Sequence, residues 1–218
     1  MFHVEQGTTH FERSFRAFAG QLSLSLPDSS IPQFSRYLSE LKVWNRAINL
    51  TAIDQDIEVV IKHFIDSMAG VQVIGNNSEM SILDIGAGAG FPSLPIKFIR
   101  PDVAMVLLEP SEKRSSFLRY MIGSLALSRM TVVTAKLQEY IERQGVAQIF
   151  DYIVVRALKV DGLGLELGRL LKPGGKVILY RAERVGNGYE LPSLALLEEL
   201  EYELPSGYGH RVLSVFSK

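Results

Sequence analysis

Apolar side chains in residues 1–80 recur every three or four positions, which predicts helices in this part of the chain. Phe11, Phe15 and Phe18 mark a first helix, which the Pro-Asp-Ser-Ser run at 27–30 ends. A second helix begins near Ser30, and residues 45–51 form a polar loop. A third helix begins near Asp56. The apolar stripes of the second and third helices are Phe34, Tyr37, Leu38, Leu41 and Trp44, and Ile57, Val60, Ile61, Phe64, Ile65 and Met68.

From Ser81 the pattern changes to short apolar runs that alternate with helical stretches, which is typical of βαβ units on a parallel sheet. We divide the chain into a helical extension, 1–78, and an α/β domain, 79–218, joined at the polar run 75–78. The sheet is expected to be doubly wound and mostly parallel, and to close with an antiparallel hairpin. The predicted strands are 82–85, 103–108, 130–134, 152–157, 176–180, 201–204 and 211–216, and the predicted helices between them are 112–127, 137–144, 163–171 and 194–200.

The composition is that of an ordinary globular protein. The 218 residues carry a formal net charge of −1, so any RNA binding must come from a local basic patch. Cysteine is absent, which excludes disulfides, thiolate metal sites and a cysteine nucleophile; we expect no metal. No run of 18 apolar residues and no signal peptide are present. We therefore expect a cytoplasmic protein with no membrane contact that acts as a monomer.

The clearest candidate site is the glycine-rich stretch that follows the strand at 82–85. Asp84 is followed by Gly86, Gly88 and Gly90, and then by Phe91. A dinucleotide fingerprint requires a glycine where Phe91 stands, and a carboxylate at Asp84 would repel a pyrophosphate. An NAD-dependent oxidoreductase is therefore disfavoured. The spacing resembles motif I of the class I S-adenosylmethionine (SAM) methyltransferases, whose cofactor carries no phosphate.

Two further positions fit a nucleoside cofactor. Glu109 ends the second strand about 20 residues after the loop, where an acid accepts the ribose hydroxyls; a solvated strand-end carboxylate is the alternative. Leu137 and Gln138 follow the third strand, where a side chain and a backbone N–H would hold the adenine edge. An ordinary helix start explains the same two residues, and both interpretations remain open.

The fourth strand ends in Val155-Arg156-Ala157, next to where a transferred methyl group would lie. The Pro-Pro signature of amino-nitrogen methyltransferases is absent, as is the cysteine that cytosine C5 enzymes require. Guanine N7 needs no general base, because its lone pair is free. Alignment alone supplies about 7–11 kcal/mol of barrier lowering. Arg156 would orient substrate or cofactor; a surface ion pair is the alternative.

Several ordered blocks together resemble the glucose-inhibited division protein B family, bacterial enzymes that methylate guanine N7 in 16S ribosomal RNA. The blocks are Trp44 to Thr51, His63 to Ser67, Asp84 to Pro92, Lys113-Arg114-x-x-Phe117-Leu118 and Val155-Arg156-Ala157. The resemblance implies a class I SAM methyltransferase (Rossmann-like) fold, a seven-stranded sheet with the helical extension, SAM as cofactor, and 16S rRNA or the small ribosomal subunit as partner.

The resemblance also implies site residues. Gly86, Phe91, Leu137, Gln138 and Arg156 match SAM-contacting positions, and Glu109 matches an acid that is usually Asp. Pro110, Ser93 and Arg181 depart from the family pattern, where Ser, Gly and Lys are usual. The basic residues expected to form an RNA-facing rim are Lys97, Arg100, Lys113, Arg114, Arg156, Arg181 and Arg211; scattered surface charges are the alternative.

Polar residues of the extension are further candidates. Asn45, Asn49, His63 and Asp66 lie beside its apolar stripes. A hydrogen-bonded pair of His63 and Asp66 that fixes the extension onto the core is as good an interpretation as substrate contact. For the whole chain we expect guanine-N7 methylation of 16S rRNA. The alternatives are a methyltransferase of another RNA, a protein or a small molecule, and a SAM-binding regulator without catalysis.

Overall fold

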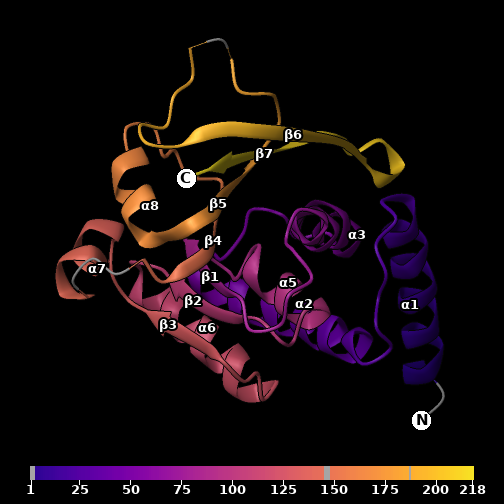
Figure 1. The fold of residues 1–218 in the computed structure, drawn as a ribbon. Coiled ribbons are helices and arrows are strands. Elements are labelled where there is room, and N and C mark those ends of the chain that lie inside the picture. Colours follow the sequence, from indigo (N-terminus) through magenta and orange to yellow (C-terminus); the bar gives the residue numbers. More distant parts are fainter. Residues whose placement is uncertain (1–2, 145–147, 187) are drawn as a thin grey trace.

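A seven-stranded sheet forms the centre of the computed structural model, which describes residues 3–144, 148–186 and 188–218 (Figure 1). The strand order is β3-β2-β1-β4-β5-β7-β6. β7 runs antiparallel to both of its neighbours, and the other pairs are parallel. The strands are β1 (Ser81–Ile85), β2 (Ala104–Leu108), β3 (Met130–Val133), β4 (Phe150–Arg156), β5 (Leu171–Arg181), β6 (Ala195–Leu204) and β7 (Gly209–Ser217). The predicted doubly wound, mostly parallel sheet is confirmed.

The register of the parallel strands places the loops that carry the predicted site at one edge of the sheet. Ile85, at the end of β1, pairs with Leu108 of β2 and with Val155 of β4. β1 lies between β2 and β4. The strand order therefore reverses at β1, with β2 and β3 on one side of it and β4 and β5 on the other. Such a switch point opens a crevice at the carboxyl ends of the strands, where ligands bind in α/β sheets.

Helices cover both faces of the sheet. α5 (Ser93–Ile99) and α6 (Glu112–Ser124) contribute Phe98 and Phe117 to a buried cluster that includes Ile82 of β1. α7 (Leu137–Gln144) and α8 (Gly164–Leu170) pack with a second cluster, which includes Leu83. Because neighbouring residues of β1 point to opposite faces, both sides of the strand are buried, as the apolar run Ile82 to Ile85 predicts.

The N-terminal residues form helices that pack on the α5–α6 face. They are α1 (His3–Gln21), α2 (Ser30–Ile48), α3 (Asp56–Val59), the π-helical turn η1 (Val60–Ile65), α4 (Asp66–Ala69) and the short 3₁₀ turn η2 (Gly70–Gln72). α2 continues to Ile48, so the loop expected from residue 45 is shorter than predicted. Asn49 caps the C-terminal end of α2: it has a left-handed φ of 51°, and its backbone N–H donates to the Asn45 carbonyl.

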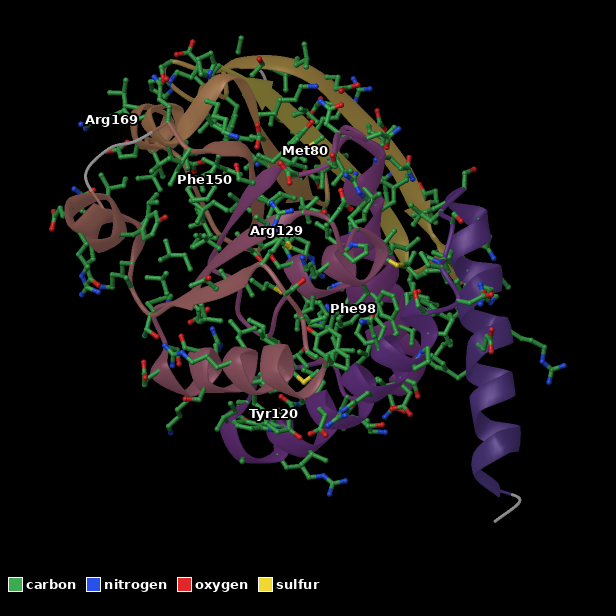
Figure 2. All side chains as sticks on the ribbon, turned by 60° about the horizontal axis from the view of Figure 1, so that its bottom comes forward. Met80, Phe98, Tyr120, Arg129, Phe150 and Arg169 are labelled. Atoms are coloured by element: carbon green, nitrogen blue, oxygen red, sulfur yellow. The ribbon has the colours of Figure 1, made fainter. Side chains whose placement is uncertain are left out.

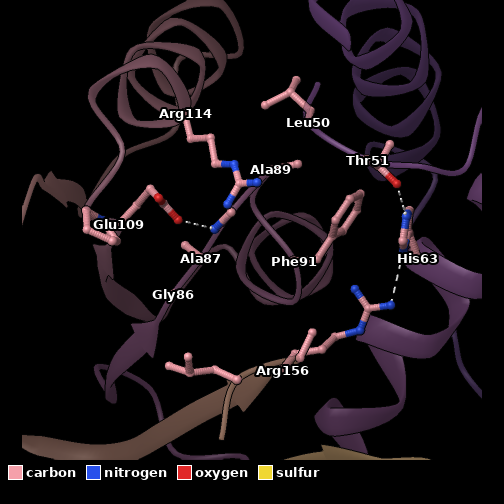
Figure 3. Close-up of a pocket in the computed structure, with 14 residues that line it drawn as sticks. Leu50, Thr51, His63, Gly86, Ala87, Ala89, Phe91, Glu109, Arg114 and Arg156 are labelled. Carbon is pink, nitrogen blue, oxygen red and sulfur yellow. Dashed lines mark hydrogen bonds between the residues drawn. The ribbon is translucent and has the colours of Figure 1, made fainter. Parts of the chain in front are cut away.

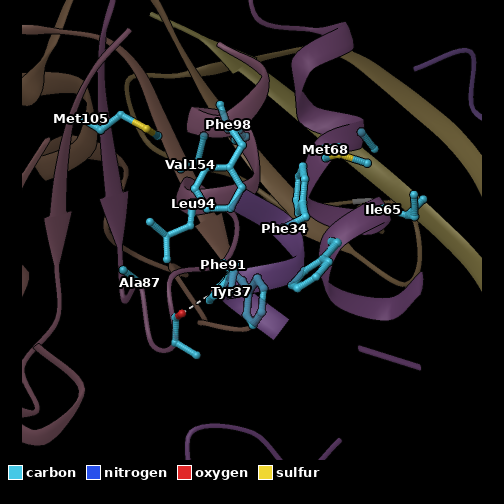
Figure 4. Packing of buried hydrophobic residues seen from close by; sticks show 14 of the residues in the cluster. Phe34, Tyr37, Ile65, Met68, Ala87, Phe91, Leu94, Phe98, Met105 and Val154 are labelled. Carbon is cyan, nitrogen blue, oxygen red and sulfur yellow. Dashed lines mark hydrogen bonds between the residues drawn. The ribbon is translucent and has the colours of Figure 1, made fainter. Parts of the chain in front are cut away.

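Aromatic rings join these helices to the sheet domain. The Phe34 ring lies 4.6 Å from Phe15 and 4.9 Å from Phe98 of α5, centroid to centroid. Tyr37 stacks on Phe64 at 5.2 Å. Figure 4 shows Phe34, Tyr37 and Phe98 in one cluster with Leu94, Met105 and Val154. The helices of the extension therefore share a core with the α/β part of the chain.

The predicted helix 194–200 is wrong, because residues 195–200 belong to the edge strand β6. β6 pairs along its length with β7, from Ala195 opposite Ser217 to Leu204 opposite Gly209. Apolar and polar residues do not alternate regularly in this stretch, so the local sequence favours a helix. Pairing with β7 outweighs this local preference. The expected pair 201–204 and 211–216 is confirmed as part of this hairpin.

The periphery of the molecule is polar, with few large apolar side chains. Figure 2 shows Phe98 inside the molecule, between the sheet and the helices, and Arg169 on its outer surface. Tyr120 is 38% exposed and packs its ring against Trp44 of α2. Within the described residues, every helix is too short or too polar to cross a lipid bilayer.

Candidate functional site

A cavity of about 330 Å³ opens at the carboxyl ends of β1, β2 and β4 (Figure 3). Its walls come from the glycine loop after β1, the ends of β2 and β4, and the segment of the extension between α2 and η1. The lining residues are Leu50, Thr51, His63, Gly86, Ala87, Gly88, Ala89, Phe91, Glu109, Pro110, Arg114, Arg156, Ala157 and Leu158. Gly86, Gly88, Phe91, Glu109 and Arg156 were all predicted from the sequence.

The glycine loop is fixed by its backbone hydrogen bonds. The N–H groups of Gly86 and Ala87 both donate to the Leu108 carbonyl, at 2.8 and 3.1 Å. Gly90 has a φ of 98°, and a Cβ there would lie 2.5 Å from Leu94 Cδ1. Both the positive φ and the short distance to the Leu94 side chain therefore favour glycine at position 90. The loop keeps its main chain open to the cavity, as close approach of a ligand requires.

Glu109 braces the loop from the end of β2. Its side chain is 2% exposed. Oε2 accepts the Gly88 N–H at 2.8 Å, and Oε1 accepts the Ser111 N–H at the same distance. Ser111 in turn caps α6. Pro110, the departure from the family pattern, lies in this turn and lines the cavity. Glu109 is therefore a fixed carboxylate at the edge of the site.

The opposite wall consists of an aromatic and cationic stack. The Phe91 ring lies 4.5 Å from the His63 ring, nearly parallel to it, and the Arg156 guanidinium carbon lies 5.7 Å from the same phenyl ring. Arg156 Nε donates to Asp66 Oδ2 at 2.9 Å, and Nη2 contacts the Lys62 carbonyl and His63 Nδ1. Arg156 is thus held by the extension, while still lining the cavity.

Asp84 does not line the cavity, although it was predicted to bind the cofactor. It is completely buried behind the glycine loop, where Oδ2 accepts a 2.5 Å hydrogen bond from Ser93 Oγ. Burial raises the pKa of this carboxyl to about 7. Ser93, which stands where the family usually has glycine, is the partner of Asp84. In this structure the acid supports the loop from behind.

Leu137 and Gln138 also lie outside the cavity lining. Leu137 packs against the cluster under α7 and α8, and Gln138 is exposed, with its amide directed to Glu142 at 3.3 Å. The structure places them at the start of α7, as the sequence predicts. A role in holding adenine stays a prediction.

Lys97 was predicted to be part of the basic rim, and this prediction is wrong. It is 2% exposed, and its ammonium donates to the carbonyls of Pro101 and Val103 at the amino-terminal side of β2. Arg100 is bound nearby to Asp102 and to the Gly75 carbonyl. Both lie away from the carboxyl ends of the strands, because a helix after a strand returns the chain to the other edge of the sheet. They cannot form a rim at the cavity.

The remaining predicted cations lie nearer the mouth. Arg114 lines the cavity from α6, and Lys113 is exposed beside it. Arg211 of β7 has Nε 3.7 Å from Asp66 Oδ1. Arg181 ends β5 at a second cavity, of about 370 Å³, which shares Ala157 and Leu158 with the first. There its guanidinium lies 5.1 Å from the centroid of the Tyr189 ring.

Thr51 ends the block Trp44 to Thr51 that resembles the family, but it was not predicted as a site residue. Its hydroxyl lies 2.8 Å from His63 Nε2, and the Asn45 side chain holds the Thr51 backbone through two hydrogen bonds, to its N–H and its carbonyl. Asn49 is exposed and caps α2. The signal in the sequence that could have pointed to Thr51 was its position six residues after Asn45, on the other side of a helix end. Within the described residues no group of three His, Asp or Glu side chains is arranged to hold a metal.

Comparison with solved structures places the sheet in a known fold. TrmN from Thermus thermophilus superposes with a TM-score of 0.52 at 21% identity, over 71% of this chain and 48% of that one. A precorrin-6y C5,15-methyltransferase from Geobacter metallireducens gives a TM-score of 0.51 at 14% identity, over 70% and 85%. At such identities the likeness concerns the fold alone, and it confirms the predicted class I (Rossmann-like) architecture.

Sequence relatives are much closer. A protein named ribosomal RNA small subunit methyltransferase G from Streptococcus sanguinis is 35% identical over 94% of this chain and 90% of its own length. A protein of the same name from Carboxydothermus hydrogenoformans is 31% identical over 95% and 91%. The family model GidB, described as rRNA small subunit methyltransferase G, matches residues 30–196. The chain therefore belongs to the GidB family, which confirms the SAM-dependent methyltransferase class predicted from its sequence.

Proposed function

We propose that this protein transfers the methyl group of SAM to N7 of a specific guanine in 16S rRNA. Its relatives are named as rRNA small subunit methyltransferases, and N7 is the atom that the chemistry of the cavity favours. The choice of N7 rests on the titratable side chains around the cavity. Those that are positioned to accept a proton already make hydrogen bonds within the protein.

The residues of the cavity fit SAM. The main chain of the glycine loop is open on one side, and a Cβ at Gly86 would lie 3.4 Å from Leu158 of the facing wall. Glu109 offers carboxylate oxygens for the ribose hydroxyls, and Arg156 offers a cation at the opposite wall. When bound, SAM supplies an electrophilic methyl group. The protein's part is to align the acceptor with that group.

No general base is available among the described residues that line the cavity. Each Glu109 oxygen accepts one backbone N–H group, and its remaining lone pair would be taken up by the ribose hydroxyls at the wall opposite Arg156. Both nitrogens of His63 have partners, Arg156 and Thr51, and burial together with the Arg156 charge lowers the pKa of His63 to about 3. An exocyclic amine must lose a proton on methylation, whereas N7 attacks with a free lone pair. The cavity therefore favours N7.

We further propose that the guanine enters from the second cavity, between β4 and β5. It adjoins the first cavity at Ala157 and Leu158 and is lined by Lys159, Asp161, Arg181 and Tyr189. The Asp161 carboxylate is itself engaged, because it accepts a hydrogen bond from the Tyr189 side chain. With Lys113, Arg114 and Arg211, these cations would contact RNA phosphates and position the substrate. The substrate would be 16S rRNA or the small subunit, the enzyme a cytoplasmic monomer, and residues 1–78 an extension of the 79–218 methyltransferase domain.

The test uses labelled SAM and 16S rRNA, both naked and in small subunits, with transcripts that carry 7-deazaguanosine as the matched substrate. We expect label in guanine-containing RNA and none in 7-deazaguanosine RNA, which lacks the N7 acceptor. Equal labelling of both RNAs would show that another atom is methylated. The absence of label from every form of 16S rRNA would refute the proposed substrate.

A further inference from the structure

The position of Arg156 is determined by groups from the N-terminal extension. Nε donates to Asp66 Oδ2 at 2.9 Å, and Nη2 donates to the Lys62 carbonyl at 2.7 Å and lies 3.1 Å from His63 Nδ1. Lys62 and His63 belong to the π-helical turn η1, a rare helix form with hydrogen bonds between residues five apart that is frequent at functional sites. The side chain of Arg156, which comes from β4, is therefore bound on two edges of its guanidinium plane.

His63 has one protonation state compatible with this arrangement. Arginine only donates hydrogen bonds, so Nδ1 must accept from Arg156 Nη2. The single proton of the neutral ring is then on Nε2, which donates to Thr51 Oγ1 over 2.8 Å. Burial, with the neighbouring Arg156 charge as the next cause, lowers the pKa of His63 to about 3. His63 is thus a fixed neutral acceptor for Arg156.

Asp66 is the second fixed partner. Its side chain is 3% exposed. While Oδ2 binds Arg156, Oδ1 accepts a 2.7 Å hydrogen bond from the Tyr202 hydroxyl of β6, and Arg211 Nε lies 3.7 Å away. The carboxylate cannot turn without breaking contacts to β4 and β6. It therefore holds the Nε edge of Arg156 in one orientation.

These contacts leave one nitrogen of Arg156 available. Nη1 has no acceptor within the described residues, and Figure 3 shows the guanidinium directed into the cavity beside Phe91. The cavity has Glu109 at its opposite wall. A ligand that carries hydroxyl groups at one end and an anionic group at the other would match these two ends. Of the polar groups of SAM, the ribose hydroxyls and the methionine carboxylate have this arrangement.

On the basis of the proposed function, we infer that Asp66 and His63 are positioning residues, which hold Arg156 so that Nη1 binds the carboxylate of the methionine end of SAM. A charge-assisted hydrogen bond of this kind is stronger than a neutral one and depends on the direction of the donor. The extension then completes the cofactor site in addition to packing on the core.

The test measures, by calorimetry on the full-length protein without RNA, the dissociation constants of SAM and of decarboxylated SAM, which lacks only the carboxylate. We expect the wild-type protein to bind SAM on the order of 10- to 100-fold more tightly than decarboxylated SAM. Asp66→Asn and His63→Ala should weaken SAM binding about 10-fold and leave decarboxylated SAM within about twofold, so that the preference falls.

Conservative and remote variants complete the design. His63→Asn keeps an acceptor near the Nδ1 position and should recover part of the preference that His63→Ala loses. Asp102→Asn breaks an arginine–aspartate pair at the other edge of the sheet and should keep the full preference. If Asp66→Asn fails to fold, the two His63 variants decide the question.

Two results would overturn the inference: a wild-type protein that binds both compounds equally, or Asp66 and His63 variants that retain the wild-type preference, whether or not they weaken both compounds alike. Failure of the proposed function is distinguishable, because it would leave the carboxylate preference intact while no methyl group reaches 16S rRNA.

Discussion

The Tyr37 hydroxyl in α2 donates a 2.5 Å hydrogen bond to the carbonyl oxygen of Ala89 in the glycine loop. Both groups are buried, and burial raises the pKa of Tyr37 well above its usual value, so the hydroxyl stays protonated. The Tyr37 ring also lies 5.4 Å from the Phe91 ring. A helix of the extension therefore holds the outer part of the glycine loop directly.

Replacing this tyrosine tests that contact. Tyr37→Phe should lower the free energy of unfolding by about 0.5–1.5 kcal/mol, because one buried hydrogen bond is lost, and it should weaken SAM binding several-fold because the loop is less fixed. Urea unfolding and calorimetry measure the two effects. Tyr152→Phe is the control, because the Tyr152 hydroxyl accepts a hydrogen bond from the Gly75 N–H at the opposite end of the parallel strands. Equal SAM affinities for wild type and Tyr37→Phe would contradict the assigned role.

Gly90 provides a second prediction. Gly90→Ala should cost about 1–2 kcal/mol for the left-handed backbone and a further ~1–3 kcal/mol because the methyl group meets Leu94. Gly162 has a φ of 81° with open space around it, so Gly162→Ala should show only the backbone cost. Thermal or urea unfolding of the two variants gives the difference. Two variants of equal stability would show that Leu94 moves aside.

Asp84 should make the stability of the protein depend on pH. Its pKa is about 7 in the folded state and near 3.9 when unfolded, so the folded state holds the proton more tightly. The resulting stabilisation is complete below about pH 4 and is lost as the pH rises to about 7, by about 1.4 kcal/mol for each pH unit crossed.

The isosteric variant Asp84→Asn removes this titration. Relative to wild type, it should become progressively more stable between about pH 4 and pH 7, as measured by urea unfolding at several pH values. His63, with its lowered pKa, contributes the opposite slope, but it is present in both proteins and cancels in the difference. A difference that does not change with pH would mean that the carboxyl titrates normally.

The shared aromatic core predicts what happens when the extension is removed. Residues 79–218 alone would expose the face that Phe34, Tyr37 and Phe64 cover, an apolar area too large for a stable monomer. We expect this fragment to aggregate or to unfold without a cooperative transition, as seen by light scattering and circular dichroism. A fragment that unfolds cooperatively and binds SAM would establish 79–218 as an independent domain.

The sequence predicted the centre of the sheet well because β1 and β4 are buried on both faces, so that apolar runs such as Ile82 to Ile85 stand out. The first part of β6, residues 195–200, was missed because an exposed edge strand has no such run and these residues fit a helix equally well; its second part, 201–204, was predicted. Gly86, Glu109 and Arg156 could be placed at the cavity because each lies at or next to a strand end, and Phe91 was predicted from the family resemblance.

Other parts of the site depend on tertiary contacts that no spacing reveals. Asp84 and Lys97 carry charges that suggest exposure, yet both are buried with specific hydrogen-bond partners. The pairing of Arg156 with Asp66 and His63 joins residues about 90 positions apart, and only the packing of the extension on the sheet brings them together. Thr51 enters the site for the same reason.

The identity of the methylated atom tests the proposed function of this protein. Small subunits that lack methylation at the target guanine are incubated with the protein and SAM carrying a labelled methyl group, and the 16S rRNA is then digested to nucleosides for mass spectrometry. We expect one labelled 7-methylguanosine per RNA, formed at a rate that falls steeply in Arg156→Ala. Label in any other nucleoside, or unchanged transfer by Arg156→Ala, would contradict it.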